Sequence, residues 1–94
     1  MIRVLIDRYY AEGMADVLRQ AELEARRRAM ATPGYISGET LRDIDDPQHN
    51  LVISTWRSRQ YWDAWRASDA RKQVVQEMNN VLVGPERITV LEPL

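Results

Sequence analysis

The sequence predicts an α+β protein whose elements follow the order strand, helix, strand, strand, helix, strand. Stretches rich in β-branched and aromatic residues open and close the chain and occur twice in its middle, as expected of strands. Two intervening stretches repeat apolar residues with the period of an amphipathic helix. The chain has 94 residues, of which 45% are hydrophobic and 29% charged, so we expect one globular domain over residues 1–94.

The first strand is predicted over residues 2–10, and Gly13 lies in the turn that follows it. The first helix starts at Met14, where the apolar period changes. Its apolar face carries six residues: Met14, Val17, Leu18, Ala21, Ala25 and Ala29. The helix is expected to end near Thr32, because Pro33 disfavours the helical conformation of the residue before it.

Two further strands are predicted over residues 35–42 and 51–57. The segment 43–50 between them is rich in Asp, Pro and Asn, which form turns. The two strands should therefore pair as a hairpin.

A second helical region follows, in two pieces that can form one kinked element. One piece is predicted over residues 58–67, and Ser68-Asp69 can cap the other. The apolar face of that second piece carries Val74, Val75, Met78 and Leu82. Alternating apolar and polar residues over 88–92 then predict the last strand.

This order of elements is the signature of the ferredoxin-like split βαβ fold. Right-handed crossovers would place the helices on one face of a four-stranded antiparallel sheet. The other face has no cover within the chain. Both faces nevertheless carry apolar residues: Ile2, Val4 and Ile6 against Leu5 and Tyr9 in the first strand, and Leu51 and Ile53 against Val52 and Trp56 in the third. We therefore expect an obligate homodimer, packed sheet against sheet with two-fold symmetry.

Composition excludes several function classes. The formal net charge of −1 provides no field that would attract nucleic acid or an acidic membrane. The absence of cysteine excludes disulfides, thiolate metal sites and a cysteine nucleophile. The apolar opening of the chain is broken at Arg3 and is far shorter than the ~20 residues of a membrane span. A cytoplasmic location is the expectation that follows.

Two charged clusters have simple structural interpretations. The arginines at 26–28 fall in the last turns of the first helix, where cations interact favourably with the helix dipole, so we expect a solvated face rather than a nucleic-acid site. The residues Asp43, Asp45, Asp46 and His49 superficially suggest a metal loop. They lack the spacing of a calcium-binding loop, and a turn explains them better.

Two segments carry a resemblance to a known family. The first begins with Pro33-Gly34-Tyr35 at the start of the second strand. The second, residues 51–69, has Trp56-Arg57-Ser58 at a strand end, then a helix with Trp65, then Ser68-Asp69. Together they resemble the antibiotic biosynthesis monooxygenase family of dimeric α+β barrel proteins. The resemblance covers nearly the whole chain and is more specific for fold than for chemistry. The family includes cofactor-free quinol or anthrone oxygenases, haem-degrading oxygenases and many members of unknown activity.

The haem-degrading branch of that family can be compared residue by residue. Its members use an Asn on the first strand, a Trp on the second helix and a His that binds iron. The matching positions in this chain are Asp7, Trp65 and one near Val75, so the iron ligand is missing. The only histidine, His49, lies in the predicted turn. We therefore expect no haem site and no cofactor.

Trp56, Tyr61, Trp62 and Trp65 form an aromatic concentration in a chain without phenylalanine. One interpretation is that these rings are anchors of a thin core. The other is that they bind a ligand, with Trp65 lining an apolar pocket in which a flat polycyclic or quinol substrate stacks. Both can hold at once.

Asp7 interrupts the apolar run of the first strand, at the position that the resemblance gives to a pocket Asn. In one interpretation it faces the pocket, where burial would raise its pKa and make it a general base for a phenol or quinol. In the other it is an outward carboxylate paired with an arginine such as Arg3 or Arg8. Tyr9 and the indole N–H groups are candidate donors to the resulting oxyanion.

These observations favour a homodimeric, cofactor-independent monooxygenase acting on a small aromatic or quinol compound. Trp65 would be its stacking wall and Asp7 its base. The alternative is a non-catalytic dimeric module that binds a small ligand or serves as an interaction domain. No metal, nucleic-acid or membrane partner is expected.

Overall fold

The computed structural model describes residues 1–94. Its elements are β1 (Ile2–Tyr9), α1 (Ala15–Met30), β2 (Tyr35–Arg42), β3 (His49–Trp56), α2 (Arg59–Arg66), α3 (Asp69–Asn79) and β4 (Arg87–Leu91). The predicted ferredoxin-like α+β fold is confirmed. The second helical region consists of two separate helices, and β3 begins at His49 rather than at residue 51.

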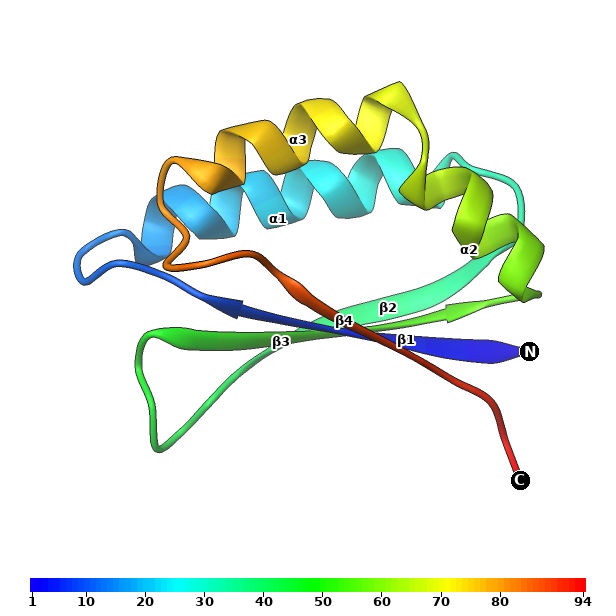
Figure 1. Ribbon diagram of the computed structural model, residues 1–94, viewed down its shortest axis with the longest axis horizontal. Coiled ribbons are helices and arrows are strands. Elements are labelled where there is room, and N and C mark those ends of the chain that lie inside the picture. Colours follow the sequence, from blue (N-terminus) through cyan, green and yellow to red (C-terminus); the bar gives the residue numbers. More distant parts are fainter.

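The four strands form one antiparallel sheet in the order β2-β3-β1-β4. All three helices lie on one face of this sheet, and the other face is free of helices (Figure 1). Helices α1 and α3 run side by side across the sheet, whereas α2 lies at one end, next to the end of β3 (Figure 1). None of the helices is long and apolar enough to cross a membrane.

Ser68 separates α2 from α3. Its backbone is extended, and its hydroxyl oxygen accepts a hydrogen bond from the backbone N–H of Arg71 at 3.2 Å, which caps α3. The same hydroxyl donates to the carbonyl oxygen of Trp65 at 2.7 Å. One side chain thus binds the last turn of α2 and the first turn of α3.

The turn between α1 and β2 depends on Gly34. Its φ of +87° lies in the left-handed region, which glycine adopts without steric cost. The ring of Tyr61 occupies the place that a Cβ at this position would take. The carbonyl oxygen of Gly34 accepts a hydrogen bond from the Arg57 N–H at 2.8 Å, so the turn packs directly against the start of α2.

Consecutive residues of β1 point to opposite faces of the sheet, as the strand pleat requires. Val4, Ile6 and Arg8 lie under the helices and are buried. Leu5 and Asp7 point to the free face. The same alternation continues across the sheet, because directly paired residues share a face.

The core under the helices consists of two apolar clusters. The first contains Val4, Ile6, Ala29, Trp56, Trp62 and Trp65. The second contains Tyr10, Leu18, Ala21, Val74, Met78 and Val81. Between them, on β1 and α1 respectively, lie the buried charged residues Arg8 and Glu22. The interior therefore has a polar centre flanked by two apolar regions.

The free face of the sheet is partly apolar. Five aliphatic side chains lie on it: Leu5, Leu41, Leu51, Ile53 and Leu91. Leu41 and Leu91 expose 42% and 44% of their surface. The expectation that both faces of β1 and β3 carry apolar residues thus agrees with the structure.

Candidate functional site

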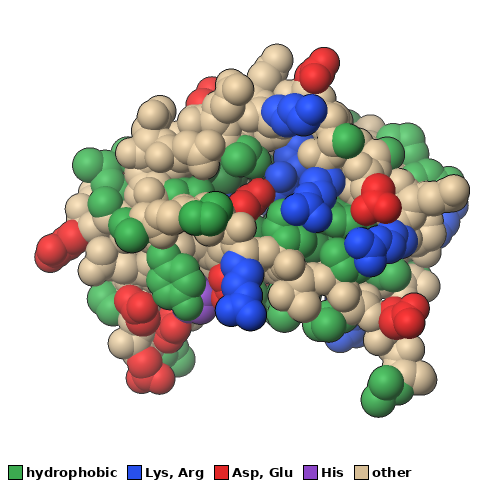
Figure 2. All heavy atoms as spheres, viewed as in Figure 1, with side chains coloured by type: hydrophobic (Ala, Val, Ile, Leu, Met, Phe, Trp, Pro, Cys, Tyr) green, Lys and Arg blue, Asp and Glu red, His purple; other side chains and the backbone are tan.

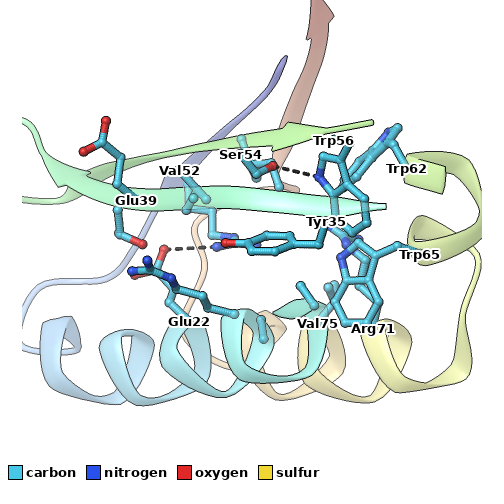
Figure 3. Close-up of a pocket in the computed structure, with 17 residues that line it drawn as sticks. Glu22, Tyr35, Glu39, Val52, Ser54, Trp56, Trp62, Trp65, Arg71 and Val75 are labelled. Carbon is cyan, nitrogen blue, oxygen red and sulfur yellow. Dashed lines mark hydrogen bonds and ion pairs between the residues drawn. The ribbon is translucent and has the colours of Figure 1, made fainter. Parts of the chain in front are cut away.

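A cavity lies between the sheet and the helices. It has about 550 Å³ of empty space, a figure that includes its opening to solvent. Figure 3 shows it bounded by β2 and β3 on one side and by the helices on the other. Its lining joins an aromatic end to a charged end.

The aromatic end is built from Trp56, Trp62 and Trp65. Trp56 is the last residue of β3, and the other two lie three residues apart on α2, hence on one helix face. The Trp56 ring stacks near Trp65 with a centroid distance of 6.4 Å, and it meets Trp62 edge-on at 5.8 Å. Its indole N–H donates to the Ser54 hydroxyl oxygen at 3.1 Å. All three rings are almost fully buried.

The charged end is a buried network of ion pairs around Arg8. The guanidinium of Arg8 donates to Glu22 at 3.0 Å and to Glu86 at 3.0 and 3.1 Å. Glu86 also accepts from Arg71 at 2.6 Å, and Glu22 accepts from the Asn50 amide at 2.9 Å. The network therefore joins five elements or loops, and its two arginines balance its two glutamates.

Two members of this network, Glu86 and Arg71, have shifted pKa values. Burial opposes the ionisation of Glu86, but the charges of Arg71 and Arg8 outweigh burial and lower its pKa. Burial lowers the pKa of Arg71, and the charge of Glu86 and its hydrogen bond oppose that shift. The guanidinium of Arg71 also lies over the Trp62 ring, 5.4 Å from its centroid. Arg71 thus links the charged end of the cavity to the aromatic end.

Two buried polar atoms in the cavity wall have no hydrogen-bond partner. They are the hydroxyl oxygen of Tyr35 and the indole nitrogen of Trp62. The Tyr35 ring meets Trp56 edge-on at a centroid distance of 5.3 Å. In Figure 3 this ring lies across the cavity, with its hydroxyl directed towards Glu22 and away from the tryptophans. Buried polar groups without partners are rare in native proteins, so both atoms call for an explanation.

Asp7 lies outside this cavity, and the expectation that it faces the pocket is wrong. Ile6 and Arg8 line the cavity, and Asp7 between them points to the opposite face of the sheet. There it pairs with His49, whose Nε2 lies 2.8 Å from the Asp7 carboxylate. The second interpretation, an outward carboxylate, agrees with this position, although its partner is a histidine and not an arginine.

Tyr9 and Tyr61 also lie outside the cavity lining. The Tyr9 ring stacks on His49, with a centroid distance of 4.4 Å and an interplanar angle of 9°. The Tyr61 ring packs on Gly34. Of the six residues that the sequence assigned to the site, the structure therefore brings together Trp56, Trp62 and Trp65.

His49 lies between two carboxylates. Its Nδ1 is 2.7 Å from Asp43, and its Nε2 meets Asp7 as described. The hydrogen bond to Asp43 raises the pKa of His49, burial lowers it, and the bond to Asp7 raises it further. The hydrogen bond from His49 and then that from the Asp45 backbone lower the pKa of Asp43. Figure 2 shows acidic side chains gathered at the lower left of this face of the molecule.

The loop that holds Asp43 is a turn, as the sequence predicts. The Asp43 carboxylate accepts hydrogen bonds from the backbone N–H groups of Asp45 at 2.9 Å and Asp46 at 3.1 Å. No group of three or more potential metal ligands occurs in the structure. The acidic residues therefore shape the hairpin and hold His49.

Comparison with known proteins places the chain in a family. The model of the family described as antibiotic biosynthesis monooxygenase matches residues 1–77, which include β1, β2, β3 and the three tryptophans of the aromatic end. The chain belongs to this family. A curated relative, the 42.8 kDa protein in the whiE locus of Streptomyces coelicolor, is 27% identical over 77 residues. That match covers 82% of this chain but 19% of the relative, so the chain spans about a fifth of the relative's length.

Solved structures agree on the fold. A conserved protein from Methanosarcina mazei has a TM-score of 0.91 at 14% identity, with 99% of this chain and 92% of that chain covered. SnoaB from Streptomyces nogalater, described as a cofactor-independent oxygenase, has a TM-score of 0.86 at 11% identity. That alignment covers 99% of this chain and 93% of SnoaB. The antibiotic biosynthesis monooxygenase fold is thus present along the whole chain.

The donor atoms in the cavity do not fit a haem of the kind that some antibiotic biosynthesis monooxygenase relatives are expected to bind. Neither a histidine nor a cysteine lines the cavity. Val75, near the position matched to the iron-binding histidine, lines it with an aliphatic side chain. His49 lies in the hairpin region on the free face of the sheet.

Sequence reasoning missed the polar half of the cavity lining. Tyr35, Arg8, Glu22 and Arg71 all line the cavity, and none was singled out for it. One signal was present: Glu22 follows Ala21 at the edge of the apolar face of the first helix, where a charged side chain is expected only if it is paired. Gly38 inside a predicted strand was a second signal, because such a glycine marks a close approach.

Proposed function

We propose that this protein is a cofactor-independent monooxygenase that oxidises a small aromatic or quinol compound inside the cavity. The observation that supports this proposal is the make-up of the cavity, with three tryptophan rings at one end and the buried Arg8–Glu22 pair at the other. An aromatic ring stacks at the first end, with Trp65 as its wall. The oxygen substituents of that ring lie at the second end.

Glu22 takes the role of proton acceptor that the sequence suggested for Asp7. It is buried in the cavity lining, whereas Asp7 is not part of that lining. Glu39 also borders the cavity, but its carboxylate points away from it (Figure 3). Each oxygen of Glu22 accepts one hydrogen bond, from Arg8 or from Asn50, and a carboxylate oxygen has room for another. The guanidinium of Arg8 stabilises the anion that the ligand becomes.

The oxidation needs only the substrate and dioxygen. In an anthrone-type substrate, removal of a proton from the ring methylene, which the conjugated carbonyl group makes acidic, leaves an electron-rich anion. The anion passes one electron to dioxygen, the two radicals combine into a hydroperoxide, and loss of water leaves a carbonyl group. The four electrons of the two C–H bonds reduce dioxygen, so one oxygen atom enters the product and the other leaves as water with the two protons.

The homodimer is part of the same proposal. The free face of the sheet carries five aliphatic side chains that no helix covers. A second copy packed on this face would bury them, and two-fold symmetry would let each copy supply the same surface. The cavity lies on the opposite side of the sheet and so stays accessible in such a dimer.

The experiment that tests the proposal is dioxygen uptake with a panel of anthrones and hydroquinones. Wild-type protein should consume dioxygen with at least one member, and Glu22→Gln should lower kcat at least tenfold. Asp7→Ala is the matched control, because it removes a carboxylate outside the cavity, and it should turn over at the wild-type rate. Retained turnover in Glu22→Gln together with loss in Asp7→Ala would refute the assigned base.

Trp65→Phe tests the stacking wall separately. A smaller ring should raise KM for the aromatic substrate more than it lowers kcat, because the wall binds substrate and does not transfer its proton. Circular dichroism in the near ultraviolet checks that the variant keeps its packed core. An unchanged KM would remove Trp65 from the binding site.

A non-catalytic ligand-binding module is the second candidate function. Both oxygens of Glu22 already have partners, and this pairing favours a carboxylate that holds the fold together. In that case quinones or quinols would quench the fluorescence of the tryptophans at the cavity, but no substrate in the panel would lead to dioxygen uptake. Uptake above the rate without protein would contradict this alternative.

A further inference from the structure

We propose that Tyr35 determines the specificity of the cavity by donating a hydrogen bond to an oxygen substituent on the ligand ring. This inference rests on the proposed function, because it requires that a ligand enters the cavity. It adds that the ligand must carry a ring hydroxyl or carbonyl at one defined place. It also predicts that aromatic hydrocarbons without an oxygen substituent bind more weakly than ligands that carry one.

The first step of the argument is the missing partner of Tyr35. Its hydroxyl oxygen is buried and makes no hydrogen bond, although the side chain lines the cavity. Burial of a hydroxyl without a partner costs free energy, which a ligand oxygen at the same place would recover. The Tyr10 hydroxyl, by contrast, donates to the carbonyl oxygen of Pro47. Of these two tyrosines, only Tyr35 has a buried hydroxyl without a partner.

The second step is that the fold makes room for this hydroxyl. Gly38 lies within β2, where glycine is unfavourable in the absence of a packing reason. A Cβ at Gly38 would lie 2.5 Å from the Tyr35 hydroxyl oxygen, closer than real Cβ contacts. The glycine thus allows the phenol ring to cross the strand. The edge-on contact with Trp56 at 5.3 Å holds the same ring from its other side.

The third step concerns what the hydroxyl faces. In Figure 3 it is directed towards the charged end of the cavity, where Glu22 and its partner Arg8 lie. Arg8 has five N–H donors, and its three hydrogen bonds to Glu22 and Glu86 leave two of them over. A ligand oxygen at this end would meet donors from both Tyr35 and Arg8. That set of donors favours an oxygen that carries negative charge, such as a phenolate or enolate.

The test compares two probes of the same shape, p-cresol and p-xylene, which differ by one hydroxyl in place of a methyl group. Their dissociation constants are measured by following the indole N–H signals of the tryptophans in NMR spectra. The measured quantity is the p-xylene constant divided by the p-cresol constant. Tyr35→Phe should lower this ratio about three- to tenfold, because it removes the hydrogen bond to the hydroxyl and leaves the ring in place.

Two variants serve as controls. Tyr61→Phe removes a hydroxyl from a ring outside the cavity lining and should leave the ratio unchanged. Gly38→Ala keeps the Tyr35 hydroxyl but displaces it, so the ratio should fall as in Tyr35→Phe. A ratio that stays at the wild-type value in Tyr35→Phe would overturn the role of Tyr35 while leaving the cavity as a binding site. Absence of binding by both probes to wild-type protein would refute the inference together with the ligand site on which it rests.

Discussion

Asp7 and His49 are joined by a hydrogen bond of 2.8 Å across the free face of the sheet, between the paired strands β1 and β3. Asp43 binds the other ring nitrogen at 2.7 Å. An imidazole can donate from both nitrogens only when it is protonated. The geometry of two carboxylates around one ring therefore favours the charged form of His49.

The pH dependence of stability should report this charge. A group whose pKa is raised in the folded state stabilises the fold at low pH, and the contribution is lost as pH rises through the folded pKa. For His49 the loss should begin above the ordinary histidine value of about 6.5. The melting temperature of the wild-type protein should fall over that range, and that of His49→Gln should not.

NMR titration of the His49 ring separates the two partners. Asp43→Asn should lower the pKa of His49 more than Asp7→Asn, because the bond to Asp43 is the largest cause of the shift. The lowered pKa of Asp43 itself should appear as stability that is lost only in acid, below the ordinary aspartate value of about 3.9. A His49 pKa that is the same in wild type and both variants would contradict this account.

Gly34→Ala should destabilise the protein more than Gly13→Ala. Both glycines have left-handed backbones, with φ of +87° and +81°, and each alanine therefore costs about 1–2 kcal/mol of backbone strain. A Cβ at Gly34 would also overlap the Tyr61 ring, whereas nothing lies within 4 Å of one at Gly13. Urea unfolding of the two variants gives the difference directly. Equal losses would show that Tyr61 moves away without cost.

Glu22→Gln should cost about 3 kcal/mol in the free energy of unfolding, because it leaves the buried Arg8 with one carboxylate partner instead of two. Glu24→Gln on the same helix is the control. Its partners are Arg27, which is largely exposed, and Arg28, which is partly exposed, so the loss of these two ion pairs should change stability less. Similar losses in the two variants would contradict the structural role of the buried network.

Ile53→Lys tests the proposed dimer. The residue lies on the free face in the middle of the sheet, opposite Leu5 on β1, and a charge there would be buried without a partner in a face-to-face pair. Light scattering should show a dimer for wild type and a monomer for this variant. Ile44→Lys changes a residue that is 94% exposed in the β2–β3 loop and should remain dimeric. A wild-type monomer at micromolar concentration would refute the dimer.

The order of elements was predictable from the sequence because strands and helices differ in the spacing of their apolar residues. The aromatic end of the cavity was predictable for the same reason, since Trp62 and Trp65 fall on one face of a short helix that follows the strand carrying Trp56. The placement of Asp7 was not, because β1 carries apolar residues on both faces. The alternation of side chains along β1 therefore did not decide which face meets the helices. The resemblance placed Asp7 on the cavity face, whereas it lies on the free face.

The polar end of the cavity could not be derived from local patterns. Arg8 and Glu86 are 78 positions apart in the sequence, and their pairing depends on how β4 returns beside β1. The close approach of the Tyr35 hydroxyl to Gly38 depends on the side-chain rotamer of the tyrosine and on an irregularity near the start of β2, where the register shifts. Such details follow from packing in three dimensions and have no periodic signature.

The strand pleat of β1 has a consequence for how proteins of this kind diverge. Neighbouring residues in that strand contribute to separate surfaces, since Arg8 lines the cavity while Asp7 and Tyr9 lie on the outer surface. Substitutions in the cavity lining can therefore accumulate without disturbing the exterior. An insertion or deletion of a single residue, by contrast, would exchange the two sets and disrupt both surfaces together.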